Sequence, residues 1–456
     1  MIVEDVTMNK RKARFHLSSA QIIIVGFLSV ILLGGLLLSL PCATAGGVRT
    51  HPLDALFTAT SSVCVTGLVV HNTATYWSAF GQAVILLLIQ IGGMGVVTIA
   101  VTVTMISGRR IGLMQRSTMQ EAISAHHVGG IVKLTGFILR TTLLIELAGA
   151  ALLSAVFCPE YGPLKGLWYG LFHSVSAFCN AGFDLLGSPV PYASLTAYAD
   201  NPLVNIVIMA LIIIGGIGFL TWEDVCTHRL HLHAYRMQSK VILTAAAVLI
   251  LVPAAYLYFF EFSSGEWADR SVADRVLAAL FQSVTPRTAG FNTVDLTELS
   301  ETGCSVMILL MLLGGAPGST AGGIKTTTAA VLILSTLALF RRRETIRCFG
   351  RRIDEHVVRE AVAILLMYIV LFFFGALVIS AVEGLPMLTC MFETASAIGT
   401  VGLTLGVTPH LGALSRIILM ALMFFGRVGG LTLIFAAFSG TQHYAARLPK
   451  EKITVG

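Results

Sequence analysis

Apolar segments long enough to cross a membrane recur along the chain, with short polar stretches between them. The first segment, SSAQIIIVGFLSVILLGGLLLSLPCATAGG, covers residues 18–47. A transmembrane helix needs about 20 apolar residues to cross the hydrocarbon layer. Further segments of this kind centre on residues 77–106, 134–157, 203–222, 241–260, 304–340, 360–382 and 412–438. The pattern predicts an all-α polytopic membrane protein with eight transmembrane helices and both termini on the same side.

The composition supports a membrane protein and excludes an ordinary soluble domain. Hydrophobic residues make up 55% of the chain, charged residues only 12%, and the mean hydropathy is +0.83. The first segment is longer than the apolar region of a signal peptide and lacks a convincing cleavage site, so we treat it as a retained helix. The eight cysteines are scattered without the spacing of a zinc site, which indicates core packing.

Basic residues gather in the segments that precede the odd-numbered spans and follow the last one. They include KRKAR (10–14), GRR (108–110), RRRETIRCFGRR (341–352) and Arg447, Lys450 and Lys452 of the tail. The opposite connections carry Asp200, Glu261, Glu266, Asp269, Glu298 and Glu301. The positive-inside bias therefore predicts cytoplasmic termini in a plasma membrane. Because membrane spans adjoin these basic segments, we expect contact with membrane lipid and no nucleic-acid partner.

A glycine-centred polar stretch occurs four times, always between an odd-numbered span and the next one. The copies are DALFTATSSVCVTGLVV (54–70), GLFHSVSAFCNAGFDLL (170–186), ALFQSVTPRTAGFNTVD (279–295) and CMFETASAIGTVGLTLG (390–406). In each copy a phenylalanine precedes a glycine by nine or ten residues; the pairs are Phe57 and Gly67, Phe172 and Gly182, Phe281 and Gly290, and Phe392 and Gly402. Four copies at matching places in the topology indicate a structural repeat.

Each repeat predicts a span, a short helix of about ten residues, an extended glycine loop and a second span. A helix of about ten residues is roughly 15 Å long, too short to cross the membrane. Irregular backbone is tolerated at membrane depth only inside protein or beside a wet cavity. Four such loops can meet on one axis, where carbonyl rings and the negative ends of four helix dipoles attract a monovalent cation. We therefore favour a pore; the alternative is that the glycines only allow close helix packing.

Six motifs give the chain a family resemblance. They are VTGL (65–68), NAGF (180–183), RTAGFN (287–292), TVGLT (400–404), GGAPGSTAGGIK (314–325) and GRVGGLTL (426–433). With them the chain resembles the Trk/Ktr/HKT superfamily of potassium transporters, and most closely the KtrB membrane subunits of bacterial Ktr systems, from the first span to the terminal KITVG. The resemblance implies four membrane-loop-membrane repeats, each with a pore helix, around a pseudo-fourfold central pore. It also implies a homodimer and a cytosolic RCK-type (KtrA-like) ring that carries the nucleotide, ATP/ADP or NAD, so that no cofactor is expected on this chain.

By position, the resemblance makes Gly67, Gly182, Gly290 and Gly402 the glycines of a selectivity filter. Potassium would bind their carbonyls and those of Val65, Thr66, Asn180, Ala181, Thr288, Ala289, Thr400 and Val401. In HKT relatives a serine at the first filter glycine accompanies sodium selectivity, so Gly67 implies potassium. The chain departs from many relatives at Cys64 and Cys179, where a less polar side chain behind the filter leaves the degree of selectivity open.

The sixth span, residues 304–340, is too long for one straight crossing. Its middle holds Pro317, Lys325 and five glycines, and glycine and proline disfavour helix by about 1 and 3 kcal/mol each. We expect a broken helix at mid-membrane. The resemblance makes residues 314–325 an intramembrane gating loop; a packing kink is the alternative. The gate residues expected there are Gly314, Gly315, Gly318, Ser319, Thr320, Gly322, Gly323 and Lys325.

Arg427 places a charge inside the eighth span, where it costs about 2.5–3.5 kcal/mol on insertion scales and needs a partner or a watery path. The resemblance implies a gate-region arginine; the alternatives are an interhelical ion pair or a cap on helix carbonyls. Other polar residues are interpreted as structural. Asp54 is expected to cap the first short helix, Glu393 and Arg287 to brace their loops, and Glu146 to have a partner elsewhere.

Two other functions compete with a channel. Ser319 in GAPGSTAGG is compatible with the nucleophile of an intramembrane protease, but the histidines lie mostly in connections, as in HHV (126–128) and HRLHLHAY (228–235). A symporter with broken helices would couple cation uptake to a second ion. We favour gated potassium uptake by a non-enzyme. The expected organisation is an N-terminal segment (1–17), repeats at 18–108, 109–225, 226–343 and 344–440, and a tail (441–456).

Overall fold

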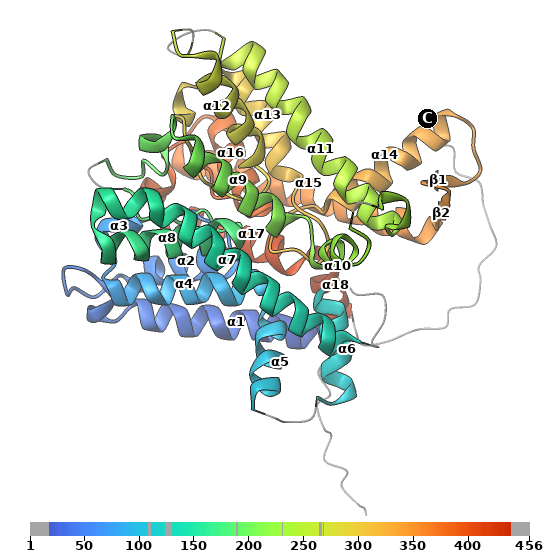
Figure 1. Cartoon of the computed structure of the whole chain (residues 1–456), viewed down its shortest axis with the longest axis horizontal. Helices are drawn as coiled ribbons and strands as arrows, with labels where there is room; N and C mark the ends of the chain where they lie inside the picture. The colour runs from blue at the N-terminus through green and yellow to red at the C-terminus, as the bar shows by residue number, and fades with distance from the viewer. Residues whose placement is uncertain are drawn as a thin grey trace, which may run out of the picture.

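The computed structural model describes residues 18–107, 111–123, 130–187, 190–229, 231–263, 267 and 269–438. Among them the chain is almost entirely α-helical, and its sheet is one two-stranded hairpin (Figure 1). The predicted N-terminal segment, the GRR and HHV stretches and the C-terminal tail lie outside the described residues.

The first helix of each repeat is a long apolar helix. These helices are α1 (Ser19–Leu38), α7 (Ile131–Tyr161), α11 (Met237–Tyr256) and α15 (Glu355–Glu383). α1 begins at a capping box, in which Ser18 and Gln21 satisfy each other's backbone N–H groups. By length and composition, four described helices can cross a membrane, or up to six spans if each bent helix pair counts as one. The protein is therefore a multi-pass helical membrane protein.

The second helix of each repeat is interrupted, although the sequence pattern predicted a break only in the sixth span. The chain bends by 97° between α4 (Ala79–Met94) and α5 (Val96–Ile106), and by 100° between α9 (Pro202–Gly216) and α10 (Phe219–His228). A break also separates α17 (Ala413–Val428) from α18 (Gly430–Phe438). At these breaks Gly95, Gly218 and Gly429 have φ of 86°, 88° and 90°, a conformation that side chains rarely adopt. These three breaks were not predicted from the sequence; Gly95 and Gly429 end their first helices, and Gly218 caps the start of α10.

The sixth span breaks as predicted. α13 (Glu301–Leu312) ends before the Gly- and Pro-rich segment, and α14 (Thr326–Phe340) begins directly after it. Leu313 and Ile324 pair as an isolated parallel bridge, so the two ends of the segment lie together. Residues 314–323, here called the cross loop, therefore leave the helix axis and return to it.

The four short helices precede the repeated glycines, as expected. They are α2 (Pro52–Val63), α8 (Pro163–Phe178), α12 (Val272–Val284) and α16 (Met387–Gly399). Their lengths of 12, 16, 13 and 13 residues exceed the predicted ten, because each starts earlier than the repeated motif. α2 and α8 begin with a proline in the first turn, and α12 and α16 follow the N-caps Ser271 and Pro386. The repeated phenylalanines, Phe57, Phe172, Phe281 and Phe392, are all completely buried and anchor these helices in the core.

Smaller elements connect the spans. α3 (Thr73–Tyr76) follows the first glycine loop, and α6 (Leu113–Ile123) packs on α1 and α5. α5 and α6 project together from the bundle, while strands β1 (Ile346–Cys348) and β2 (Arg351–Ile353) lie beyond α14 at its edge (Figure 1). The outward faces of the long helices carry exposed leucines and phenylalanines such as Leu36, Leu144 and Phe374, as a lipid-facing surface requires.

Candidate functional site

The four repeated glycines lie at the centre of the molecule and form a closed ring. A Cβ built on Gly67 would lie 2.5 Å from the carbonyl oxygen of Ala181, and one on Gly182 would lie 2.7 Å from that of Ala289. Gly290 faces the Val401 carbonyl in the same way, even more closely, and Gly402 faces the Thr66 carbonyl. Each repeat thus presents its backbone to the next, in chain order, and the last repeat meets the first.

The glycine loops, residues 65–67, 180–182, 288–290 and 400–402, share one backbone conformation. The glycines have φ between 68° and 94°, and the residues two positions earlier, Val65, Asn180, Thr288 and Thr400, also have positive φ, between 49° and 68°. Non-glycine residues adopt this region rarely and at a cost of about 1–3 kcal/mol. All twelve residues of these loops are buried. The structure therefore brings every predicted filter residue together in one strained, repeated geometry.

A hydroxyl side chain braces each glycine loop, and none of these four residues was predicted from the sequence. Ser61 and Ser396 accept the N–H of Gly67 and Gly402 at 3.1 and 3.0 Å. Ser176 donates to the carbonyl oxygen of Phe183 at 2.8 Å, and Thr285 donates to that of Phe291. All four lie four residues after the repeated phenylalanine, one helical turn further along. This constant spacing was the sequence signal that could have revealed them.

We predict that Ser396→Ala destabilises the fourth glycine loop. The buried N–H of Gly402 would lose its partner, which costs about 1–3 kcal/mol. The midpoint of thermal unfolding in detergent should fall, and cation preference should fall with it. Ser305→Ala is the matched control, because Ser305 is exposed on α13 and bonds only to the Glu301 carbonyl of its own helix. Equal behaviour of the two variants would contradict the bracing role.

The residue directly after the repeated phenylalanine braces two of the glycine loops, at the backbone that follows the glycine. Glu393 accepts hydrogen bonds from the Thr404 and Thr408 hydroxyls and from the Leu405 N–H, at 2.5, 2.6 and 3.1 Å. In the second repeat, His173 accepts from the Leu185 N–H at 3.3 Å. Both side chains are fully buried and both bind the backbone three residues after the glycine. The predicted bracing role of Glu393 agrees with these contacts.

The third glycine loop is tied to the second through side-chain and backbone contacts. The Asn180 amide donates to the Arg287 carbonyl at 3.2 Å and to the Thr288 hydroxyl at 3.3 Å. The Arg287 side chain is buried, and its Nε has no hydrogen-bond partner among the described residues. Arg287 therefore supports the loop through its backbone carbonyl, which agrees with the predicted bracing role.

The two cysteines that depart from the family pattern end short helices and lie behind the glycine loops. Cys64 is the C-cap of α2 and Cys179 is the C-cap of α8, and both are completely buried. The Cys179 thiol lies 3.7 Å from the Gln90 side chain and 4.0 Å from the Glu146 carboxyl group. Gln90 also donates to Glu146 at 3.2 Å, which is the partner expected for Glu146.

The cross loop lies beside the ends of the short helices and touches several repeats. The Thr320 hydroxyl donates to the Phe178 carbonyl at 3.0 Å and contacts the Asn180 amide oxygen at 3.2 Å. The Ala316 N–H donates to the Gly216 carbonyl at 2.9 Å, and the Gly323 N–H donates to the Gly426 carbonyl at 3.2 Å. The loop therefore bonds to both the second and the fourth repeats.

The remaining residues predicted for the gate hold the cross loop in shape. The N–H of Gly314 donates to the Ile324 carbonyl at 2.8 Å, and the Gly315 carbonyl accepts from Thr326 at 3.0 Å. Ser319 donates to the Ala316 carbonyl, and Lys325 donates to the Ala321 carbonyl at 2.8 Å. The positions where Gly318 and Gly322 would carry a Cβ are filled by the Ile123 carbonyl and the Thr400 side chain, respectively, so the loop is closely packed.

Arg427 joins the cross loop to the first repeat. Its guanidinium group donates to the carbonyl oxygens of Thr320 in the loop and of Gly92 and Gly93 at the end of α4, the last at 2.9 Å. It forms no ion pair with any described residue. Of the alternatives that the sequence left open, the cap on helix carbonyls is therefore correct and the ion pair is wrong for the described residues. Arg427 also contacts Thr320 of the cross loop, and the gating role expected from the resemblance stays a prediction.

A cavity of about 280 Å³ lies on one side of the cross loop. Its lining includes Ser319 of the loop, Lys325 at the start of α14, Arg427 of α17, Glu121 of α6 and Tyr368 of α15. The cross loop thus lines this cavity and also contacts Asn180 and Thr400 of the glycine loops.

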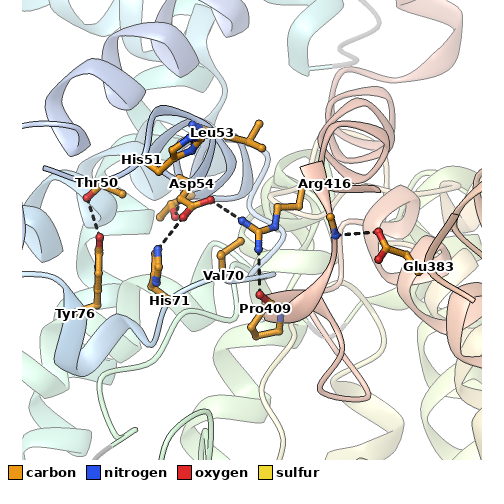
Figure 2. Close-up of polar contacts among 12 residues, drawn as sticks. Thr50, His51, Leu53, Asp54, Val70, His71, Tyr76, Glu383, Pro409 and Arg416 are labelled. Atoms are coloured by element: carbon orange, nitrogen blue, oxygen red, sulfur yellow. Dashed lines mark hydrogen bonds and ion pairs between the residues drawn. The ribbon is translucent and has the colours of Figure 1, made fainter. Parts of the chain in front are cut away.

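An ion-paired network joins the first and last repeats beside the start of α2 (Figure 2). Asp54 accepts from Arg416 of α17 at 2.6 Å and pairs with His71 at 3.0 Å. The Arg416 guanidinium also donates to the Pro409 carbonyl at 3.0 Å, and the His71 ring stacks on Tyr76 with 3.9 Å between the ring centroids. The predicted capping role of Asp54 was wrong: His51 is the N-cap, and Asp54 instead closes the ring of repeats.

We predict that Asp54→Asn destabilises the protein by about 2 kcal/mol, because it leaves a partly buried Arg416 without its counter-charge. The measurement is the midpoint of thermal unfolding. Glu223→Gln is the control. Glu223 pairs with Arg236 at 2.8 Å, but both side chains are exposed, so the pair should contribute less than about 1 kcal/mol to the free energy of unfolding. A larger effect at Glu223 would show that the network does not hold the repeats together.

Comparison with known proteins gives the chain clear relatives. Residues 6–443 match the TrkH family, described as a cation transport protein. The chain is 38% identical over 457 residues to the potassium/sodium uptake protein NtpJ of Enterococcus hirae, with 99% of this chain and 100% of that protein covered. It is 39% identical to the Ktr system potassium uptake protein B of Bacillus subtilis, with 96% of each covered. The solved structure of the potassium transporter TrkH from Vibrio parahaemolyticus has the same fold, with a TM-score of 0.71 at 21% identity over 94% of this chain and 86% of that one.

The fold and these matches define the class as a multi-pass membrane transport protein and not an enzyme. The chain belongs to the TrkH family of cation transport proteins, and the family resemblance seen in its motifs is confirmed. The protease alternative is wrong, since the family is one of transporters.

Proposed function

We propose that the protein takes up potassium across the plasma membrane through a selectivity filter made by its four glycine loops. The closed ring of glycines, each facing the backbone carbonyl that precedes the next, carries this proposal. A ring of backbone carbonyls can replace the hydration shell of a monovalent cation. The names of the relatives in Enterococcus hirae and Bacillus subtilis, a potassium/sodium and a potassium uptake protein, support the same cargo.

The fold supports a pseudo-fourfold arrangement with eight crossings. Each repeat has one long first helix and one interrupted second helix, and each short helix ends at the ring. The C-terminal ends of the four short helices carry partial negative charge and lie at the ring, which favours a cation there. The termini are proposed to be cytoplasmic, on the charge bias of the sequence.

The cross loop and Arg427 are proposed to gate this pathway. The loop contacts Asn180 and Thr400 of the glycine loops, both the loop and Arg427 line the cavity, and three carbonyl contacts of Arg427 hold the loop to its neighbours. A positive charge at this place raises the barrier for a cation. A relative is named Ktr system potassium uptake protein B, and the word system supports partner components. On the motif resemblance, the proposed assembly is a homodimer with a cytosolic ring-forming subunit, on which the nucleotide would bind.

Cation flux into liposomes that hold the purified protein tests the function. Under an imposed potential, potassium and rubidium should enter far faster than sodium, and the flux should carry net charge. No flux of any of these ions in protein of confirmed fold would overturn the proposal.

Coupled uptake is the second candidate, favoured by the potassium/sodium name of the Enterococcus relative. In that case potassium would enter only with sodium, in a fixed ratio. The same liposomes distinguish the two, because a channel needs no sodium on either side.

A further inference from the structure

The segment between α14 and α15 carries a concentrated positive charge. Residues 341–353, here called the arginine hairpin, contain six arginines and one acidic residue, Glu344. All six are exposed; they are Arg341, Arg342, Arg343, Arg347, Arg351 and Arg352. None of them forms an ion pair with a described residue. The part of the fold that the structure describes therefore leaves this charge without a counter-charge.

The β-strands fix how part of this charge is presented. Arg347 lies directly opposite Arg352, and Ile346 lies opposite Ile353. Ile353 is buried, and Ile346 lines a groove with Ser335 of α14 and Val358 of α15. Because successive residues of a strand point to opposite faces, the Arg347–Arg352 pair faces away from the helices. Like charges directly opposite on two strands destabilise the pair, unless an anion lies between them.

The hairpin also lies where a membrane surface is expected. It begins directly after Phe340, the end of the apolar helix α14, and stops two residues before the long apolar helix α15. Leu339 and Phe340 are 74% and 77% exposed, and Phe349 at the hairpin turn is 53% exposed. Apolar and aromatic side chains next to arginines suit the boundary between acyl chains and headgroups.

We propose that the arginine hairpin binds the phosphate headgroups of anionic phospholipids. The Arg347–Arg352 pair would hold one phosphate through charge-assisted hydrogen bonds, and Arg341, Arg342 and Arg343 would add attraction to the anionic surface. Phe340 and Phe349 would enter the acyl boundary. A second copy of the chain is a poor occupant, because the same patch on both copies would repel. An acidic cytosolic protein would match the charge but not the exposed apolar side chains.

The test measures the thermal unfolding midpoint of the full-length protein in neutral detergent. Short-chain phosphatidylglycerol, which is anionic, should raise the midpoint in a saturable way, and short-chain phosphatidylcholine should not. Arg347→Gln/Arg352→Gln should need at least about tenfold more phosphatidylglycerol for half of the effect, since each arginine near an anionic surface contributes about 1 kcal/mol. Lys165→Gln is the matched control, because it removes one exposed positive charge at the start of α8 and should respond like the unmodified protein.

Three outcomes would overturn the proposal. The first is an equal response to phosphatidylglycerol in the double variant and the unmodified protein. The second is the same midpoint rise with inorganic phosphate, which would make the site one for a free anion. The third is no lipid effect in either protein, which would assign the arginines to an acidic protein partner. Arg347→Lys/Arg352→Lys keeps the charge and the fold, and an affinity between those of the other two proteins would show that the paired guanidinium groups matter.

Discussion

Gly67→Ser should lower the preference for potassium over sodium by at least about tenfold. Gly67 has φ of 92°, and the position of its missing Cβ lies 2.5 Å from the Ala181 carbonyl oxygen. A serine there must displace this carbonyl or rotate the loop, and either change alters the ring proposed as the filter. A tenfold loss of preference corresponds to about 1.4 kcal/mol between the two ions. The measurement is the ratio of potassium to sodium flux in liposomes.

A matched control separates this effect from general damage at a glycine. Gly47 also has positive φ, 66°, but no atom of the described protein lies near the place of its Cβ. Gly47→Ser should therefore leave the flux ratio unchanged. If Gly67→Ser has the same ratio as the unmodified protein at normal flux, Gly67 does not belong to a filter.

Deletion of residues 316–322 should raise potassium flux in the absence of any partner protein by at least about tenfold. The deletion removes the bonds of Thr320 to Phe178 and Asn180 and the carbonyl that Arg427 holds. The Leu313–Ile324 pairing brings the two ends together, so a short connection can replace the segment. The cavity beside the loop would then be continuous with the glycine ring, and the ion would meet a lower barrier.

Arg427→Gln tests the same gate without a change in chain length. It removes the charge but keeps hydrogen-bond donors for the Gly92 and Gly93 carbonyls, so we expect a smaller rise in flux than with the deletion. Potassium selectivity should stay the same in Arg427→Gln, because Arg427 bonds to no residue of the glycine loops; the deletion also removes the Thr320 contact with Asn180. A folded deletion variant with reduced flux would show that the loop supports conduction and does not block it.

The parts of the site that depend on the backbone could be predicted from the sequence. The four repeated glycines combine positive φ with no room for a Cβ, so glycine recurs at the matching place of each repeat. The braces Ser61, Ser176, Thr285 and Ser396 were missed because a hydroxyl within a polar stretch is common and its role depends on where the next turn lies. Their constant distance from the phenylalanines became meaningful only with the contacts.

The helix breaks and the long-range pairs were harder to predict. Gly95, Gly218 and Gly429 each close a four-residue pattern, GGMG, GGIG and GRVG, but glycine is common within unbroken membrane helices and the apolar run continues past it. The Asp54–Arg416 pair joins residues 362 positions apart, and no local pattern indicates such a partner. From the sequence, the place of Asp54 near a helix start suits a capping role as well as a distant ion pair. In the structure His51 is the N-cap, which leaves Asp54 for the pair.

The cross loop has a consequence for how such an architecture can arise. Among the described residues only the third repeat carries this insertion, and it bonds to the second and fourth repeats and to Arg427. An assembly of four identical subunits could not accommodate it, because four symmetry-related copies would compete for one volume. Joining the repeats in a single polypeptide lets one of them diverge while the other three keep the ring intact. A single covalent chain thus allows a fourfold-like ring of loops to carry one asymmetric insertion, which the proposed gate requires.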